Sequence, residues 1–235
     1  MSVVYRSSLV ELHHGDAIDV LRTLPSGSAD LLLTDPPYGV EYRSGHRAKP
    51  FDRLLGDGQT QRDEIGSIIK DAARLVRRRR HMYVFGPPDV LPDAGVTVPV
   101  TIIWDKARHG MGDLSSPWSR SYEPISFLVK TDRSAGITNL PARMRKQTVL
   151  RFLPPVGRNR HPTEKPLGLL QELIESSSRQ GETVLDPFAG VGSTGVAAVL
   201  CGRRALLVEL DERYVTTALD RLKKAERIYN EMQGC

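Results

Sequence analysis

The last third of the chain holds the feature that most constrains its fold: a short apolar run, a glycine-rich turn and two helical segments in close succession. The first apolar run ends at Asp186 and a second one ends at Glu209. Between them, Gly190, Gly192 and Gly195 form a Gly-x-Gly-x-x-Gly pattern. The strands and helices that these periodicities predict are, in chain order, 183–185, 196–200, 204–208 and 211–232. Strands that alternate with helices in this way are typical of an α/β protein with a parallel sheet.

Other apolar runs extend the same alternation toward the N-terminus. The expected strands are 9–14, 29–34, 82–85, 101–104 and 125–129, and the expected helices are 17–24, 61–76 and 166–176. Four arginines at 77–80 follow the second helix, and we interpret them as a solvated helix end more readily than as phosphate ligands. A chain of 235 residues is long enough to bury one α/β core. We therefore expect one domain over residues 1–235, built on a single doubly wound, mostly parallel sheet.

The glycine-rich turn predicts a cofactor site. Glu209, at the end of the second strand, stands at about the distance where dinucleotide-binding proteins keep the acid that holds ribose hydroxyls. This pattern alone does not separate NAD from other ribose-bearing cofactors. Asp186 favours S-adenosylmethionine, because a carboxylate before the turn would repel a pyrophosphate but suits a cationic methionyl group. The alternative is that the glycines serve only tight strand–helix packing.

A second constellation, Asp35-Pro36-Pro37-Tyr38, follows the apolar run 29–34. The prolines end the strand and stiffen the turn, so Asp35 is expected at the carboxyl end of a strand, where open α/β sheets bind ligands. A carboxylate and a carbonyl can accept hydrogen bonds from both N–H groups of an aromatic amine and so localise its lone pair. Tyr38 could stack on a base. A simple surface turn is the alternative.

Charge is unevenly distributed. Residues 101–160 contain eleven basic and four acidic residues, a balance of +7 within a chain of net charge +5. Such a segment is expected to face a polyanion, with a solvated basic loop as the alternative. The candidate residues for contact with such a polyanion are Arg143, Arg145, Lys146, Arg158 and Arg160.

Several classes of protein are disfavoured. Cys201 and Cys235 lie far apart and form no disulfide framework, which is typical of the cytoplasm. We find no signal peptide, no apolar run of membrane-spanning length and no zinc-ligand spacing, so we expect no membrane and no metal partner. Asp16 also follows an expected strand, where it could contact a ligand or cap the next helix.

Taken together and in this order, the motifs resemble the β group of DNA amino-methyltransferases, enzymes of bacteria and phages that use S-adenosylmethionine to methylate adenine N6 or cytosine N4. The matching stretches are Gly15-Asp16, Asp35-Pro36-Pro37-Tyr38, His161-Pro162-Thr163-Glu164-Lys165-Pro166, Asp186-Pro187-Phe188-Ala189-Gly190-Val191-Gly192, and Glu209 with Asp211-Glu212-Arg213-Tyr214. The resemblance implies a circularly permuted, Rossmann-like methyltransferase fold. It also implies that a variable segment at 107–160 recognises the target.

The resemblance also implies roles for individual residues. Asp35 and the Pro36 carbonyl would bind the target amino group, with Pro37 completing the motif and Tyr38 stacking on a flipped-out base. The residues expected to surround the cofactor are Asp16, Thr163, Lys165, Asp186, Phe188, Gly190, Gly192, Thr194 and Glu209, with Thr163 and Lys165 near its carboxylate. An aspartate at the first motif position is mostly found in adenine-specific members.

We therefore predict direct methyl transfer to adenine N6 in DNA. The alternatives are cytosine N4 methylation, RNA or protein-amide methylation, an NAD-dependent oxidoreductase, and a catalytically silent DNA-binding protein. Members of the family often dimerise, so a homodimer is possible.

Overall fold

A computed structural model describes residues 2–37, 58–86, 96–107, 118–119, 121–130, 146–155 and 164–234, without the side chains of 58–62 and 96–99. Its strands are β1 Ser2–Arg6, β2 Val10–His14, β3 Ala29–Thr34, β4 Val76–Phe85, β5 Val96–Asp105, β6 Tyr122–Lys130, β7 Val149–Arg151, β8 Thr183–Asp186 and β9 Arg204–Glu209. Its helices are α1 Ala17–Thr23, α2 Gly58–Leu75, α3 Leu167–Ser177, α4 Ser193–Leu200 and α5 Glu212–Gln233.

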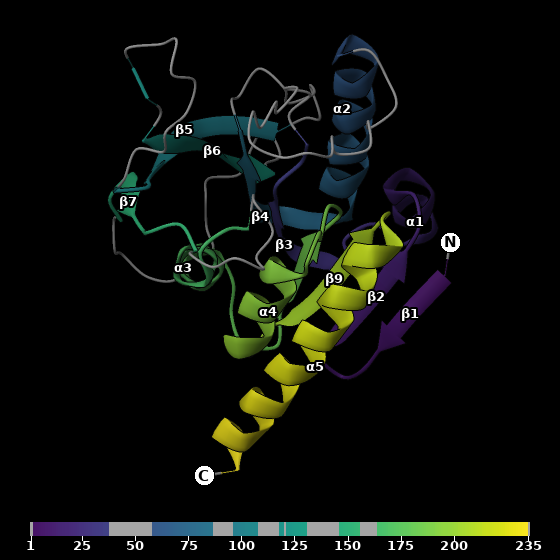
Figure 1. Ribbon diagram of the computed structural model, residues 1–235. Helices are drawn as coiled ribbons and strands as arrows, with labels where there is room; N and C mark the ends of the chain where they lie inside the picture. The colour runs from purple at the N-terminus through teal and green to yellow at the C-terminus, as the bar shows by residue number, and fades with distance from the viewer. Residues whose placement is uncertain are drawn as a thin grey trace, which may run out of the picture.

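The strands form one sheet in the order β1-β2-β9-β8-β3-β4-β6-β5-β7 (Figure 1). The five strands from β2 to β4 in this order are mutually parallel. Antiparallel pairing occurs where β1 joins β2 and where β6 joins β4 and β5. The sheet is therefore mostly parallel, and the predicted fold class is confirmed.

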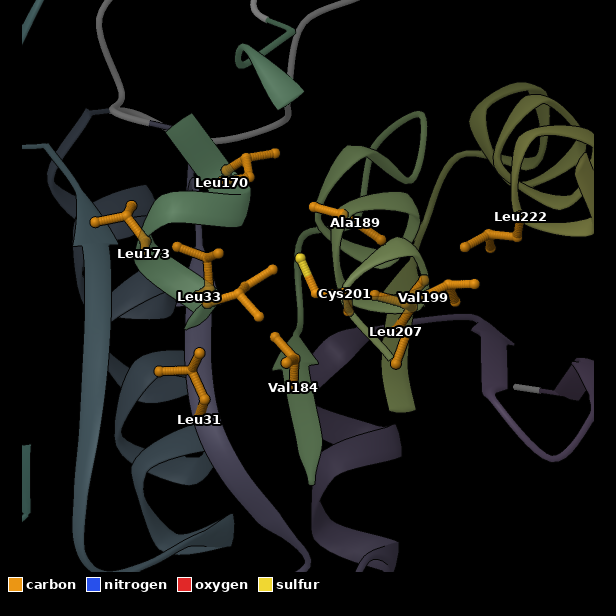
Figure 2. Packing of buried hydrophobic residues seen from close by; sticks show 14 of the residues in the cluster. Leu31, Leu33, Leu170, Leu173, Val184, Ala189, Val199, Cys201, Leu207 and Leu222 are labelled. Carbon is orange, nitrogen blue, oxygen red and sulfur yellow. The ribbon is translucent and has the colours of Figure 1, made fainter. Parts of the chain in front are cut away.

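Helices cover both faces of the sheet. Strand β3 shows why, because all six of its residues are buried and alternate side chains face opposite ways. Leu31 and Leu33 pack in the cluster that includes α3, α4 and α5, whereas Leu32 packs with α1 and α2. Figure 2 shows the first cluster, with Leu33 and Val184 between the sheet and the helices. Each fully buried leucine contributes about 1.5–3 kcal/mol to the free energy of unfolding.

The four arginines at 77–80 are not a helix end, so this interpretation was wrong. Helix α2 ends at Leu75, and the arginines lie in β4. The guanidinium of Arg77 lies 2.7 Å from the carboxylate of Asp30, and that of Arg80 makes two hydrogen bonds to Glu182. Asp30 is only 1% exposed, and a buried carboxylate needs such a partner. Strand pairing and these ion pairs together stabilise residues 77–80 as part of β4, so α2 does not continue through them.

Strands β1 and β7 were not predicted. Strand β7 pairs in parallel with β5 inside a segment that shows no periodicity. Its three residues are too few to produce a periodic signal. In the described part of the chain, none of the helices combines the length and the apolar character that a bilayer crossing requires.

Candidate active site

Four carboxylates lie along one edge of the sheet. Strands β2, β9, β8 and β3 are consecutive and parallel, so their carboxyl ends meet at the same edge. Asp16 follows β2 closely, Glu209 ends β9, Asp186 ends β8, and Asp35 follows β3 directly. The topology therefore brings together acids that are spread over almost the whole sequence, at the edge where open α/β sheets bind ligands.

The three glycines of the turn have three different tasks. Gly190 has φ +53, and no atom of the described residues lies within 4 Å of the position that a Cβ would take, so a ligand can approach the backbone there. Gly192 is the N-cap of α4 with φ +79, and a Cβ there would lie 3.0 Å from Ala218 Cβ. A Cβ at Gly195 would lie 2.5 Å from Leu207 Cδ1. Packing thus explains Gly192 and Gly195, whereas the open space at Gly190 fits the approach of a cofactor.

Glu209 is fixed beside this turn by backbone hydrogen bonds. Its Oε2 accepts from the N–H of Gly190 at 2.6 Å, and its Oε1 accepts from the N–H of Asp211 at 2.8 Å. Burial raises the pKa of the Glu209 carboxyl, although these hydrogen bonds oppose the shift. A carboxylate oxygen can accept more than one hydrogen bond, so Glu209 retains the capacity to bind hydroxyl groups.

Asp186 lies beneath the turn and is only 2% exposed. Its Oδ1 accepts hydrogen bonds from Thr34 Oγ1 at 2.7 Å and from the N–H of Phe188 at 3.0 Å. Burial raises the pKa of Asp186 to about 6, against the opposing effect of hydrogen bonds from Thr34, Thr194 and Phe188. Asp186, which is predicted to lie near the methionyl group of the cofactor, thus also connects the glycine-rich turn to β3.

Asp16 acts as the N-cap of α1, the alternative weighed for it. Its Oδ1 accepts from the backbone N–H of Ile18 at 2.8 Å and of Asp19 at 3.4 Å. The N–H of Gly15 donates to the carbonyl oxygen of Glu209 at 3.0 Å, which ties this cap to the end of β9. The contact with adenine that the resemblance implies for Asp16 stays a prediction.

Asp35 is part of a charged cluster that the sequence did not predict. Its Oδ2 lies 2.7 Å from Nζ of Lys165, which also lies 2.8 Å from Oε1 of Glu123. The Asp35 side chain keeps 25% of its surface exposed, whereas that of Lys165 keeps 9%. Pro36 is buried and Pro37 is half-buried. The predicted catalytic carboxylate is thus accessible and is held by an enclosed cation.

A family model described as DNA methylase matches residues 29–220. The chain belongs to this DNA methylase family. Over 90% of its length it is 28% identical to the DNA adenine methyltransferase YhdJ of Escherichia coli K12, covering 82% of that protein. It is 25% identical to TTHA0409 from Thermus thermophilus, which is assigned as a DNA modification methylase and was solved with S-adenosyl-L-methionine. This match covers 92% of the present chain and 95% of TTHA0409, with a TM-score of 0.66. The cytosine-N4-specific PvuII DNA methyltransferase shares the fold, with a TM-score of 0.70 over 97% of this chain and 94% of its own at 17% identity.

The structure brings together most of the residues that the sequence assigns to the site of this DNA methylase. Thr194 is buried in the first turn of α4, and Phe188 contacts the core between the sheet and α1 and α2. Tyr38, Thr163, Arg143, Arg145, Arg158 and Arg160 lie outside the described residues.

Four cations of the basic segment of this DNA methylase lie in the described residues, and all four have partners within the protein. Lys146 pairs with Glu172 at 2.6 Å, and Arg151 pairs with Asp105 at 2.7 Å. Lys130 donates to two carbonyl oxygens at the end of α2 and to one at the start of β4, and Lys106 pairs with Glu123 at 3.1 Å. Each of the four cations of 101–160 that the structure describes is thus engaged within the protein. Within the same described ranges, no three His, Cys, Asp or Glu side chains are grouped closely enough to hold a metal ion.

Sequence reasoning missed Glu123, Phe85 and Trp104. Glu123 stands in β6 and pairs with Lys165, which lies just before α3, and the rings of Phe85 and Trp104 lie near the same ammonium. Phe85 and Trp104 each stand at or next to the end of a strand, which is the signal that could have found them. Nothing in the sequence around Glu123 marks it, because its role depends on sheet order.

Proposed function

We propose that this DNA methylase transfers the methyl group of S-adenosylmethionine to the exocyclic N6 of adenine in DNA. The observation that carries the proposal is the adjacency of two strand ends. Asp35 follows β3, and Asp186 with the glycine-rich turn follows β8, its parallel neighbour. The hydrogen bond from Thr34 to Asp186 joins these ends. The two motifs to which this proposal assigns the base and the cofactor therefore stand side by side.

Residues of the chain fit the proposed cofactor at three points. Gly190 leaves room for close approach to the backbone, and Glu209 offers a fixed carboxylate to ribose hydroxyls. Asp186 supplies negative charge beneath the turn, which complements a cationic ligand. When bound, S-adenosylmethionine supplies an electrophilic methyl group on a positively charged sulfur.

Asp35 and Pro36 would bind and orient the amino group. The lone pair of an aromatic amine is delocalised into its ring, which makes the nitrogen a weak nucleophile. Hydrogen bonds from its two N–H groups to the Asp35 carboxylate and the Pro36 carbonyl would localise that lone pair. Pro36 cannot act as a backbone donor, so its peptide nitrogen does not compete for acceptors. Positioning of this kind supplies much of the rate enhancement in two-substrate reactions.

The base must leave the double helix to reach this motif. Extruding a base costs a few kcal/mol of pairing and stacking. Stacking of the extruded base on Tyr38 would offset about 1–3 kcal/mol of this cost. The amino nitrogen loses one proton during or after methyl transfer, and Asp35 is the carboxylate placed to pass it to solvent. A homodimer and the target-recognition role of 107–160 belong to this proposal as well.

The test is methyl transfer from labelled S-adenosylmethionine to unmethylated DNA, followed by digestion to nucleosides. Label in N6-methyladenine is the expected result. Label in N4-methylcytosine would keep the reaction and change the base. Cofactor binding without transfer to any of several DNA substrates would contradict the proposed acceptor.

DNA contact by the basic segment has its own test. Binding that rests on phosphate contacts weakens steeply with salt, with the logarithm of affinity falling by about 0.9 per contact and per tenfold salt increase. Four cations of this segment are engaged within the protein, so the response should reflect the remaining ones. An affinity that does not change with salt would contradict this contact.

A further inference from the structure

Lys165 is enclosed at the carboxyl edge of the sheet by two carboxylates and two aromatic rings. Its Nζ lies 4.8 Å from the ring centroid of Phe85 and 5.9 Å from that of Trp104. Both rings come from strand ends, and both are buried. An ammonium in such a place is held by ion pairs on one side and by cation–π attraction on the other. The side chain of Lys165 therefore has a defined position instead of sampling solvent.

We infer that Lys165 is a positioning residue for the carboxylate of Asp35 and is not a ligand of the carboxylate of the cofactor. This inference rests on the proposed function, because Lys165 acts through Asp35, the residue proposed to bind the target amine. It departs from the role that the resemblance implies for Lys165. The contact that carries it is the 2.7 Å approach of Nζ to Asp35 Oδ2.

The ion pair orients Asp35, and a single ammonium occupies only part of the acceptor capacity of a carboxylate. Asp35 stands just beyond the end of β3, where the pleat of the strand no longer sets the direction of its side chain. An ionised carboxylate has about four lone-pair sites on its two oxygens, so the ammonium and an amino group can be bound together. The positive charge also stabilises the ionised form of Asp35, which is the form that accepts hydrogen bonds from an amine.

Glu123 holds Lys165 from the opposite side. Its Oε1 contacts Lys165, while its Oε2 lies 3.1 Å from Nζ of Lys106. Burial lowers the pKa of Lys165, but the carboxylates of Asp35 and Glu123 outweigh this effect and hold the pKa above its usual range. Lys165 is therefore a permanent cation near neutral pH. The series Lys106, Glu123, Lys165 and Asp35 alternates in charge and connects β5, β6 and β3.

The residue before Lys165 anchors the same segment to the glycine-rich turn. Glu164 accepts a hydrogen bond from Nη2 of Arg221 in α5. Nη1 of Arg221 donates to the carbonyl oxygen of Val191 at 2.8 Å and to Ser193 Oγ at 3.2 Å. Two consecutive residues thus reach the two motifs, Glu164 the cofactor turn and Lys165 the base-binding aspartate. This double attachment fixes where the ammonium stands.

The test compares Lys165→Met with a matched control. Methionine keeps the length and apolar contacts of the side chain and removes the charge. Lys223→Met removes an exposed ammonium that lies 5.4 Å from the Tyr5 ring, away from the carboxyl edge. For Lys165→Met we expect kcat to fall by about a hundredfold, as for other misplaced reacting groups. We expect the Kd for S-adenosylmethionine, measured by calorimetry, to stay within about twofold of wild type, since the inference leaves cofactor contacts intact.

A pH profile separates this role from a merely structural one. The charged groups near Asp35 include Lys165 from the segment before α3 and Asp186 from β8, and Glu123 of β6 pairs with the same Lys165. Removal of the ammonium leaves the two acids of this set around Asp35, so protonation becomes easier. The acid limb of the kcat profile should move to higher pH by about one unit or more in Lys165→Met. It should not move in Lys223→Met.

Opposite outcomes overturn the inference. A tenfold rise in the Kd for S-adenosylmethionine with an unmoved acid limb would assign Lys165 to the cofactor. If Lys165→Met does not fold, Lys165→Gln, which is also uncharged, takes its place and is judged by the same two measurements: a raised acid limb with a wild-type Kd supports the inference, and a tenfold higher Kd with an unmoved acid limb contradicts it. Wild-type enzyme without transfer to DNA contradicts the proposed function itself, and the inference falls with it. An active wild type with an unchanged Lys165→Met profile contradicts the inference alone.

Discussion

Thr34 donates a hydrogen bond of 2.7 Å to Asp186, and this contact joins the ends of β3 and β8 directly below the two motifs. Both residues are buried, at 1% and 2% exposure. The hydroxyl is thus the link between the strand that presents Asp35 and the strand that presents the glycine-rich turn.

Thr34→Val should remove this link while keeping the shape of the side chain. A buried carboxylate that loses a donor costs about 1–3 kcal/mol of unfolding free energy. Urea denaturation measures the effect. Thr217→Val is the matched control, because Thr217 Oγ1 donates to a carbonyl of its own helix on an exposed face. Equal midpoints for the two variants would show that the Thr34 hydroxyl does not stabilise the strand pair.

Asp186 should make stability depend on pH. Its folded pKa of about 6 lies above the ordinary value, because the buried carboxyl prefers its neutral form. The folded state therefore binds the proton more tightly than the unfolded state does. The contribution of Asp186 to the free energy of unfolding is consequently lost as pH rises from about 4 to about 6. A shift of two units corresponds to about 3 kcal/mol. Asp186→Asn keeps an Oδ1 acceptor and cannot titrate, so the difference in unfolding free energy between wild type and variant should change over this range. A constant difference from pH 4 to pH 7 would contradict the raised pKa.

Gly195→Ala should destabilise the fold. The added Cβ would lie 2.5 Å from Leu207 Cδ1 and 2.8 Å from Leu222 Cδ2, and crowding of this kind costs about 1–3 kcal/mol. Thermal denaturation measures it. A variant as stable as wild type would show that the helix packing at this point can relax freely.

Gly190→Ala should mainly affect ligand binding. The positive φ of Gly190 costs an alanine about 1–2 kcal/mol, but its methyl group meets no atom of the described residues. If the cofactor approaches this backbone, the methyl group occupies its space, and affinity for S-adenosylmethionine should fall about tenfold, or about 1.4 kcal/mol. Calorimetry measures the Kd, with Gly195→Ala as the comparison for a stability effect alone. Unchanged affinity would place the cofactor elsewhere.

Asp35→Asn should abolish most turnover and leave cofactor binding intact. The amide keeps the size of the side chain, yet it loses the charge that pairs with Lys165 and half of the acceptor capacity. We expect kcat to fall by about a hundredfold or more. Asp220→Asn, an exposed change on α5, is the control. Loss of cofactor binding in Asp35→Asn would indicate a structural role for Asp35.

Sequence patterns correctly predicted the strands and turns that are determined by neighbouring residues. The strand ending at Asp186, the turn at Gly190 and the position of Asp35 follow from apolar runs, glycines and prolines that stand next to one another. The sequence also offered the correct alternative for Asp16, because an N-cap is a contact between near neighbours.

Contacts between distant strands could not be predicted in this way. The ion pairs of Asp30 with Arg77 and of Glu182 with Arg80 pull the arginines into β4, and they exist only once β3, β4 and β8 lie side by side. The same holds for Glu123 and Lys165, which are distant in sequence and meet only once β6 and the segment before α3 are in place. Lys130 shows why net charge misleads: its ammonium caps the carbonyl oxygens of α2, so it contributes to folding instead of to an outer surface.

The parallel pairing of β2 with β9 has a consequence for synthesis on the ribosome. His14 aligns with Glu209, so the side of the site near Asp16 is completed only by one of the last strands to be made. At about 5–20 residues per second, β2 waits on the order of ten seconds or more for its partner. A chain released early would already carry Asp35 and its prolines, yet it would lack β9 and Glu209. Translation thus makes the stretch around Asp35 well before the strand that carries Glu209.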